Sequence, residues 1–276
     1  MESKSIPIEA RIAGLGWFLY LVLTSLVLGF GLGTLLYWPV RLISFAFPDL
    51  RPLSDRIMQK SISVLLGAQP WLAFGSREFA RAISAVQDVG GDRKSGVLLV
   101  SNHRSHLDMF LLLARVPGIR VLAKRGLFAI PLLGFMMVAS RQIPVRRKNL
   151  KSFVGAMDTI GERLAAGEIV HVFPEMTRSV PDFRGVAAFN PAPFLTAMKA
   201  GVPILPFLIT GTSETWPKGS FALRPGTAVK LSPLTPIRRE ALPKFAGAKE
   251  LAEFCRAEIE AACLADHRKL KAEVSA

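Results

Sequence analysis

A histidine and an aspartate stand in a short polar segment that directly follows an apolar run. The run is Val97 to Ser101, and the segment is Asn102-His103-Arg104-Ser105-His106-Leu107-Asp108. A carboxylate that holds an imidazole fixes its tautomer and makes its free nitrogen more basic, which suits removal of a hydroxyl proton. In one continuous helix His103 and Asp108 would point about 140° apart, so such a dyad requires a turn between them. The alternative is that Asp108 only completes a capping box at a helix beginning near Ser105.

The residues after this segment form a block without any acidic side chain. From Met109 to Met157 there is no Asp or Glu, whereas the cations are Arg115, Arg120, Lys124, Arg125, Arg141, Arg146, Arg147, Lys148 and Lys151. A solvated, ion-paired surface normally mixes both signs. The block therefore favours a phosphate-binding site or contact with an anionic membrane.

Two further motifs lie at the ends of expected strands, one after a strand and one at the start of a strand. The segment Val172-Phe173-Pro174-Glu175-Met176-Thr177-Arg178-Ser179 has a proline where a strand must end, and it places Glu175 and Arg178 at the edge of a sheet. The segment Gly201-Val202-Pro203-Ile204-Leu205-Pro206 begins another strand. Its two prolines predict an edge strand or a strand beside a bulge.

The elements that would position these motifs alternate between strands and helices, which predicts an α/β fold with a mixed sheet flanked by helices. Short buried strands are expected at Val97–Val100, Arg120–Ala123, Gln142–Val145, Ile169–Phe173, Ile204–Ile209 and Ala228–Leu231. Helices are expected at Asp108–Arg115, Leu150–Ala166, Phe194–Ala200 and Ala248–Lys271.

The N-terminal part of the chain has a different character. The run from Ile12 to Val40 carries no charge and exceeds the roughly 20 residues that cross a bilayer as a helix. Its glycines allow either one tilted span or two shorter helices in one leaflet. Lys and Arg accumulate after the run, which favours the cytoplasmic side. We expect a membrane-attaching helical region over residues 1–80, including a second apolar patch at Ile62–Phe74, and an α/β domain over residues 81–276.

The composition limits the kinds of molecule that the protein is expected to bind. The 276 residues are half apolar, and 35 Lys and Arg against 21 Asp and Glu give a net charge of +14. Such a chain is not intrinsically disordered, and it favours an anionic membrane or a phosphorylated substrate. The cations lack the interleaved aromatic residues of a nucleic-acid platform. Cys255 and Cys263 lie too far apart along one helix for a disulfide, and no His/Cys cluster predicts a metal site.

The four motifs, in this order, resemble those of the glycerolipid acyltransferase family typified by 1-acyl-glycerol-3-phosphate acyltransferase. That family carries NHxxxxD, a basic block ending in an arginine after a short strand, FPEGTRS, and a VPIxP strand. Here the corresponding segments are Asn102–Asp108, Ile143–Arg146, Phe173–Ser179 and Val202–Pro206, and the segment with Ala123-Lys124-Arg125, Pro131 and Gly134 is also similar. The likeness covers about Val97 to Ile209.

The resemblance implies that His103 is the general base and that Asp108 orients it. It also implies that the acceptor is held by Asn102, Lys124, Arg146, Glu175, Thr177 and Arg178. The expected reaction moves an acyl group from an acyl thioester, carried by CoA or by acyl carrier protein, to the hydroxyl of a lysophosphatidate, giving phosphatidate without a cofactor or metal. The expected location is the cytoplasmic face of the inner or plasma membrane.

Two departures from the family pattern bear on the acceptor. Met176 stands where the family has glycine, and Asn190 stands where the family's F-K-x-G pattern has a cation. A side chain at a position with positive φ would reshape the pocket. Two alternatives therefore remain open: the same chemistry on another lysolipid such as a lyso-aminolipid, and a non-catalytic protein that binds anionic lipid through the basic block.

Overall fold

A computed structural model describes residues 8–25, 27, 33–70, 72–74, 76–90, 96–130, 133–178, 185–220 and 222–275. Parts of the sequence motifs lie outside these residues. They are Pro131, Ser179, residue 71 of the Ile62–Phe74 patch and part of the Ile12–Val40 run.

One mixed seven-stranded sheet organises the molecule, which confirms the predicted mixed sheet, although β1 is not among the expected strands. Its strands lie in the order β1-β7-β6-β2-β5-β3-β4. The five strands from β6 to β4 are parallel to their neighbours, β7 is antiparallel to β6, and β1 is parallel to β7. The bounds are β1 (Ala73–Phe74), β2 (Val97–Ser101), β3 (Arg120–Lys124), β4 (Ile143–Val145), β5 (Ile169–Val172), β6 (Ile204–Thr210) and β7 (Ala228–Pro233).

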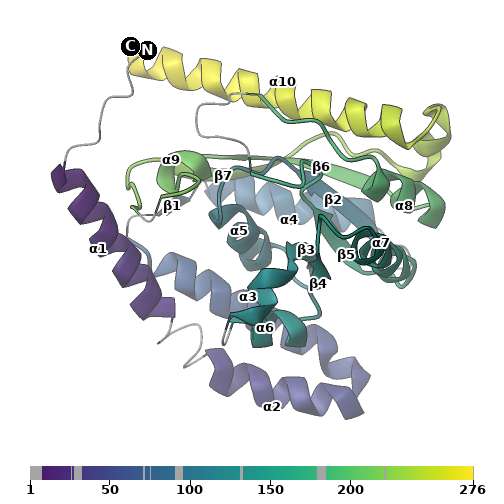
Figure 1. The fold of residues 1–276 in the computed structure, drawn as a ribbon, viewed down its shortest axis with the longest axis horizontal. Coiled ribbons are helices and arrows are strands. Elements are labelled where there is room, and N and C mark those ends of the chain that lie inside the picture. Colours follow the sequence, from purple (N-terminus) through teal and green to yellow (C-terminus); the bar gives the residue numbers. More distant parts are fainter. Residues whose placement is uncertain are drawn as a thin grey trace.

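Helices cover both faces of this sheet (Figure 1). Along β2, Leu98 and Val100 belong to one buried cluster while Val97 and Leu99 belong to another, because successive side chains of a strand point to opposite faces. The first cluster includes residues of α7, α8 and α10, and the second includes residues of α4 and α5. The bounds are α4 (Ser76–Gly90), α5 (Leu107–Arg115), α6 (Leu133–Ala139), α7 (Leu150–Ala165), α8 (Ala192–Ala200), α9 (Thr212–Thr215) and α10 (Ala248–Ser275).

The N-terminal region consists of α1 (Ile8–Thr24), α2 (Gly33–Ala46) and α3 (Arg51–Gly67). The charge-free run is thus divided between α1 and α2. Within the described ranges, no helix combines the length and the apolarity needed to cross a bilayer. Several large apolar side chains of α1 and α2 are nevertheless exposed, among them Ile12, Leu19, Leu35, Leu36 and Leu42. Attachment of this region to a membrane stays a prediction.

The apolar patch at 62–74, which could have been a further interfacial helix, is not a separate helix. It consists of the last turns of α3 and strand β1, and Leu65, Leu66 and Leu72 are buried in the protein. Its hydrophobicity therefore reflects core packing, which sequence alone does not distinguish from an interfacial face.

An ion-pair network joins α3 to the sheet. Arg120 on β3 is 4% exposed and donates through Nη1 and Nη2 to both carboxylate oxygens of Asp55 on α3, at 3.1 and 2.7 Å. Its Nε donates to Oε2 of Glu168 at 2.7 Å, and Glu168 also accepts from Arg141 and Arg163. The Asp55 and Glu168 partners raise the pKa of Arg120 despite the opposing effect of its burial. The network therefore fixes the helical region against the α/β domain.

Strand β6 is internal, so of the two alternatives, an edge strand or a strand beside a bulge, the edge strand is wrong. It lies between β2 and β7, and Pro206 pairs with Val100 of β2. The proline is tolerated because its carbonyl faces Leu234, accepting from Leu234 N at 2.9 Å, just beyond the end of β7. The missing N–H therefore points to the side of β7, where the regular ladder is interrupted and antiparallel pairing resumes at Ile204 and Ile237 with one extra residue on the partner segment, which fits the bulge alternative.

Replacing Arg120 by Met should lower the free energy of unfolding by about 3 kcal/mol or more, because it leaves the largely buried Asp55 without its cation and removes one of the three arginines that hold Glu168. Urea unfolding measures the change. Arg256→Met on α10 is the matched control, since Arg256 also holds two carboxylates, Glu253 and Glu260, but Glu253 is 61% exposed. The control should cost less than about 1 kcal/mol. Equal losses for the two variants would contradict the anchoring role.

Candidate active site

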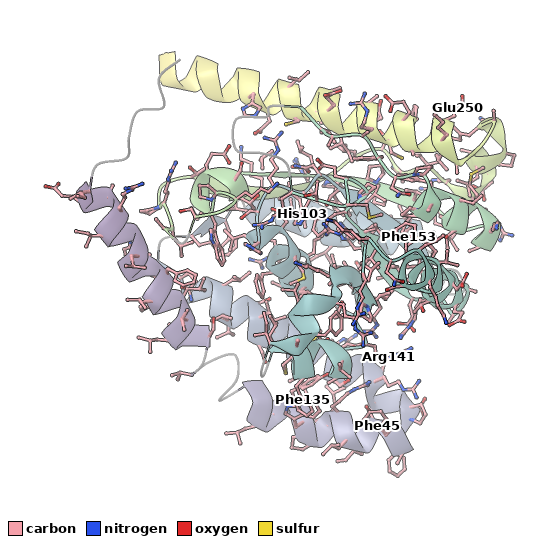
Figure 2. The ribbon with its side chains drawn as sticks, viewed as in Figure 1. Phe45, His103, Phe135, Arg141, Phe153 and Glu250 are labelled. Carbon is pink, nitrogen blue, oxygen red and sulfur yellow. The ribbon has the colours of Figure 1, made fainter. Side chains whose placement is uncertain are left out.

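The predicted site residues gather at one edge of the sheet. His103 follows β2, Glu175 follows β5, Lys124 ends β3 and Arg146 follows β4. These four strands are parallel neighbours, so their carboxyl ends meet at the edge where α/β proteins place their ligands. His103 lies near the middle of the molecule (Figure 2).

The His103–Asp108 dyad is formed, as predicted. Nδ1 of His103 lies 2.9 Å from Oδ2 of Asp108. The same oxygen accepts the backbone N–H groups of Arg104 and Ser105 at 2.7 and 2.9 Å. The contact with Ser105 N is also one half of a capping box, so both interpretations of Asp108 hold at once. Because the carboxylate only accepts, the proton between the two side chains belongs to Nδ1 and the lone pair to Nε2.

The imidazole of His103 is held flat against an aromatic ring. It stacks on Phe173 with ring centroids 3.9 Å apart and an interplanar angle of 19°. Its side chain is 13% exposed, and no described group hydrogen-bonds to its Nε2. Stacking and the Asp108 contact fix the ring, while Nε2 keeps its capacity to accept a proton.

Asn102 and Glu175 support the dyad. Asn102 is 1% exposed, and its amide exchanges two 2.8 Å hydrogen bonds with the backbone of Ile209 on β6. Glu175 is 7% exposed; it accepts from His103 N at 2.7 Å and from Ala187 N at 3.2 Å. The structure thus engages these two side chains in positioning the His103 backbone rather than directing them at open solvent.

Arg178 is a predicted site cation that interacts electrostatically with Asp108 of the dyad. Its Nη1 is buried and has no hydrogen-bond partner within the described structure. Burial lowers the pKa of Arg178, and the negative charge of Asp108 opposes that shift. A buried guanidinium nitrogen without a partner can donate a hydrogen bond to an anionic ligand at little extra desolvation cost. The neighbouring Thr177 is exposed.

Lys124 and Arg146 contribute to one open pocket of about 810 Å³. The other cations that line it are Arg125, Arg147 and Lys148. Burial and the charge of Arg178 lower the pKa of Arg147. The charge of Arg178 therefore acts both on Arg147 in the basic pocket and on Asp108 in the dyad. In the described ranges, no group of three or more His, Cys, Asp or Glu could hold a metal ion.

The acid-free block does not form a single phosphate-binding surface, which corrects the simplest form of that expectation. Arg120 and Arg141 are paired with carboxylates from outside the block, Asp55 and Glu168. Tertiary structure thus separates these two ion-paired arginines from the five cations of the block that line the basic pocket.

Met176 has φ of 56°, so the condition of a left-handed backbone at this position, which the sequence left open, is met. Its side chain is half-buried and packs against the core cluster that contains Val172 and Phe194. Asn190 accepts from Ala192 N at 2.9 Å at the beginning of α8. Both departures from the family pattern therefore have structural uses, and neither supplies a cation.

Sequence reasoning missed two participants. It singled out Phe173 only as part of a motif, although its ring supports the imidazole, and it left Arg147 without a role. Nothing in the local sequence pairs Phe173 with a histidine seventy positions away, whereas Arg147 stood in the acid-free block and could have been chosen.

A histidine–aspartate dyad at the carboxyl edge of a parallel sheet suits general-base chemistry on a hydroxyl group. Residues 80–210 match the family model described as Acyltransferase. The chain is also similar over nearly its whole length to a crystal structure of the lysophosphatidate acyltransferase PlsC from Thermotoga maritima. The TM-score is 0.67, the identity is 25%, and 95% of this chain and 98% of the other are covered.

Curated relatives agree with this assignment. A chloroplast 1-acyl-sn-glycerol-3-phosphate acyltransferase of Brassica napus is 36% identical over 44% of this chain and 35% of its own length. One from Chlamydomonas reinhardtii is 32% identical over 58% of this chain and 46% of its own length. The matches thus span about a third to a half of these relatives. The chain is thus similar to the acyltransferase family over the segment that contains the dyad and the basic pocket.

A buried histidine beside the dyad predicts a pH dependence of stability. His171 lies in β5 with Nε2 2.9 Å from Ser101 Oγ, and burial followed by the charge of His103 lowers its pKa from 6.5 to about 3. Below about pH 6.5 the unfolded chain binds a proton at this position and the native protein does not. The contribution of neutral His171 to the free energy of unfolding is therefore fully present above pH 6.5, and it falls as the pH drops toward 3.

Between about pH 7.5 and pH 5, His171 should account for roughly 2 kcal/mol of lost unfolding free energy. Urea titrations at both pH values should show a smaller loss in His171→Gln than in the unmodified protein. Replacement of the exposed Lys199 by Gln provides a control that keeps the full pH dependence. Identical pH dependences in the unmodified protein and His171→Gln would refute the assignment.

Proposed function

We propose that the protein is an O-acyltransferase that moves a fatty acyl group from an acyl thioester to the free hydroxyl of 1-acyl-glycerol-3-phosphate, giving phosphatidate. The observation that carries the proposal is the His103–Asp108 contact, with Nδ1 bound and Nε2 free at the edge of the sheet. The names of the family's relatives support lysophosphatidate as the acceptor.

In the proposed reaction, Nε2 of His103 takes the proton of the acceptor hydroxyl as its oxygen attacks the thioester carbonyl. A new C–O bond forms, and the tetrahedral intermediate then expels sulfur as the C–S bond breaks. The proton on Nε2 passes to the leaving thiolate, so the histidine returns to its starting state. Asp108 stabilises the transient imidazolium and keeps its orientation. No covalent acyl-enzyme is formed.

The acceptor phosphate is proposed to bind the free cations of the site. Arg178 offers a buried nitrogen without a partner, and Lys124, Arg146 and Arg147 line the adjoining basic pocket. A phosphate dianion favours several charge-assisted donors at once. Thr177 adds an exposed hydroxyl beside Arg178.

The proposal includes a membrane as the source of the acceptor, at its cytoplasmic face, with the thioester as co-substrate and no resident cofactor. Exposed apolar side chains on α1 and α2 support attachment of the N-terminal region. CoA and acyl carrier protein remain the two candidate carriers of the acyl group.

His103→Ala should lower turnover by about 10³-fold, the size expected when a general base is removed. Release of free thiol from acyl-CoA, and separately from acyl-carrier-protein thioester, measures the rate in detergent-purified protein. His267→Ala on α10 is the matched control and should retain full activity. Near-normal thiol release by folded His103→Ala would refute the mechanism, and no release with either carrier would favour a non-catalytic lipid-binding protein.

Arg178→Ala should raise the KM for lysophosphatidate by about tenfold or more, since it removes a charge-assisted donor to phosphate. The KM for a lysolipid without a phosphate monoester, such as a lyso-aminolipid, should change little. Lys199→Ala on α8 is the control cation.

The same comparison of lysolipid acceptors tests the second candidate function, an acyltransferase for another lysolipid. That candidate is favoured by Asn190, whose side chain accepts from Ala192 N at the start of α8, where the family's pattern has a cation. A preference of the unmodified protein for a lyso-aminolipid, with no effect of Arg178→Ala on any acceptor, would move the function to that substrate and exclude lysophosphatidate.

A further inference from the structure

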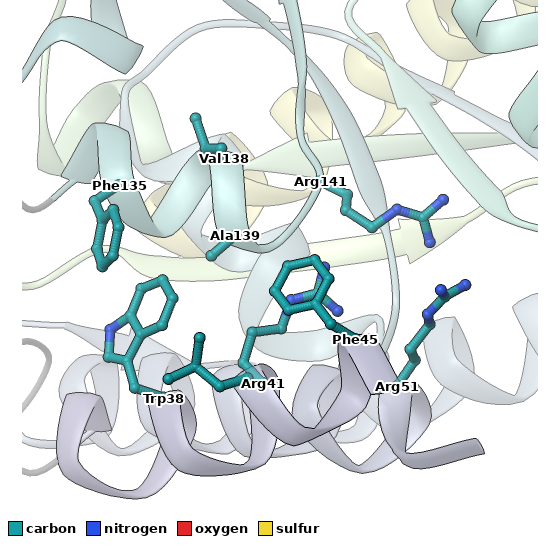
Figure 3. Close-up of a pocket in the computed structure, with 9 residues that line it drawn as sticks. Trp38, Arg41, Phe45, Arg51, Phe135, Val138, Ala139 and Arg141 are labelled. Atoms are coloured by element: carbon teal, nitrogen blue, oxygen red, sulfur yellow. The ribbon is translucent and has the colours of Figure 1, made fainter. Parts of the chain in front are cut away.

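A second pocket lies between α2 and α6, and none of the predicted site residues lines it. Its volume is about 770 Å³. Trp38 of α2 stacks on Phe135 of α6 with ring centroids 4.0 Å apart and an interplanar angle of 25°. The rest of its apolar wall is formed by Leu42, Phe45, Val138 and Ala139 (Figure 3). We call this pocket the α2–α6 groove. Such a wall accommodates a hydrocarbon chain and gives no hydrogen bonds to a sugar or a base.

A buried cation lies in this wall. Arg41 is 5% exposed, and its guanidinium carbon lies 4.9 Å from the centroid of the Phe45 ring. Its one described hydrogen-bond acceptor is the hydroxyl of Ser44, 3.3 Å from Nη1, and its Nε is buried without a partner. No described carboxylate forms an ion pair with it. A buried charge without a counter-ion is costly, and a bound anion would offset that cost.

Two more guanidinium groups lie at the same end of the groove. Arg51 of α3 and Arg141, which follows α6, both line it and point to the same side in Figure 3. Burial lowers the pKa of Arg141, and the charge of Arg51 contributes to that shift, so the two like charges repel each other. Glu168 holds Nη2 of Arg141 at 2.7 Å. An anion placed between these arginines would replace repulsion by attraction.

We propose that the α2–α6 groove is a binding site for one anionic phospholipid, separate from the site of acyl transfer. The acyl chain lies along Trp38, Phe135 and Val138, and the phosphate meets Arg41, Arg51 and Arg141. Charge complementarity selects an anionic amphiphile over a neutral one, and the apolar wall selects an amphiphile over a free anion. The exposed apolar residues of α2 next to the groove, including Leu36 and Ile43, extend the surface available to lipid.

Isothermal titration calorimetry tests the proposal by measuring how tightly a short-chain phosphatidylglycerol binds the full-length protein. The lipid is kept below its critical micelle concentration. Short-chain phosphatidylcholine tests the need for net negative charge, and inorganic phosphate tests the need for the chain. Phosphatidylglycerol should bind about tenfold more tightly than phosphatidylcholine, as expected for lost charge-assisted contacts, and inorganic phosphate should bind far more weakly than either.

Arg41→Met keeps the apolar wall and removes the buried charge. It should weaken phosphatidylglycerol binding about tenfold while leaving phosphatidylcholine binding unchanged. Without lipid, its thermal unfolding midpoint should equal or exceed that of the unmodified protein, because no counter-ion is lost. Lys60→Met removes an exposed cation of α3 that does not line the groove, and it should bind like the unmodified protein.

A brominated acyl chain provides the location of the lipid, since bromine quenches tryptophan fluorescence on contact. Quenching by a brominated phosphatidylglycerol should decrease in Trp38→Phe. Equal losses of phosphatidylglycerol affinity in Arg41→Met and Lys60→Met would show that the lipid responds only to the overall surface charge. Quenching unaffected by Trp38→Phe would place the lipid elsewhere, and equal affinity for inorganic phosphate would make the site an ion site. Each of these three results overturns the proposal without bearing on acyl transfer.

Discussion

One carboxylate oxygen organises the candidate active site. Oδ2 of Asp108 accepts the imidazole N–H of His103 and the backbone N–H groups of Arg104 and Ser105. It therefore sets the turn that follows β2, the start of α5 and the orientation of the histidine together. A buried acceptor with three donors has little freedom to move, so the position of Nε2 depends on the packing of β2 and α5 more than on the histidine itself.

The parallel sheet provides the second constraint. Strands β2, β5, β3 and β4 end at one edge, so segments distant in sequence contribute His103, Glu175, Lys124 and Arg146 to the same edge. Glu175 links two of these ends by accepting from His103 N. The site is therefore a property of strand order, and loops with little structure of their own acquire defined positions from the strands.

Burial decides what each cation does. Arg120 is buried with two carboxylates and holds the helical region to the sheet. Arg178 has a buried nitrogen without a partner, and the cations of the basic pocket are exposed to a ligand. Arg41 is buried without a carboxylate partner among the described residues. The same residue type thus stabilises the fold in one place and favours an anion in two others.

Sequence alone determined the elements and the chemistry. Short apolar runs gave the strand positions from β2 to β7 to within a few residues, because hydrophobic periodicity is a local property. The spacing of His103 and Asp108, with a family resemblance over Val97–Ile209, indicated the dyad. Tertiary structure alone decided that β6 is internal, that the acid-free block is divided, and that Asn102 bonds to Ile209 rather than facing solvent. These outcomes depend on contacts between segments far apart in the chain, and local patterns carry no information about such partners.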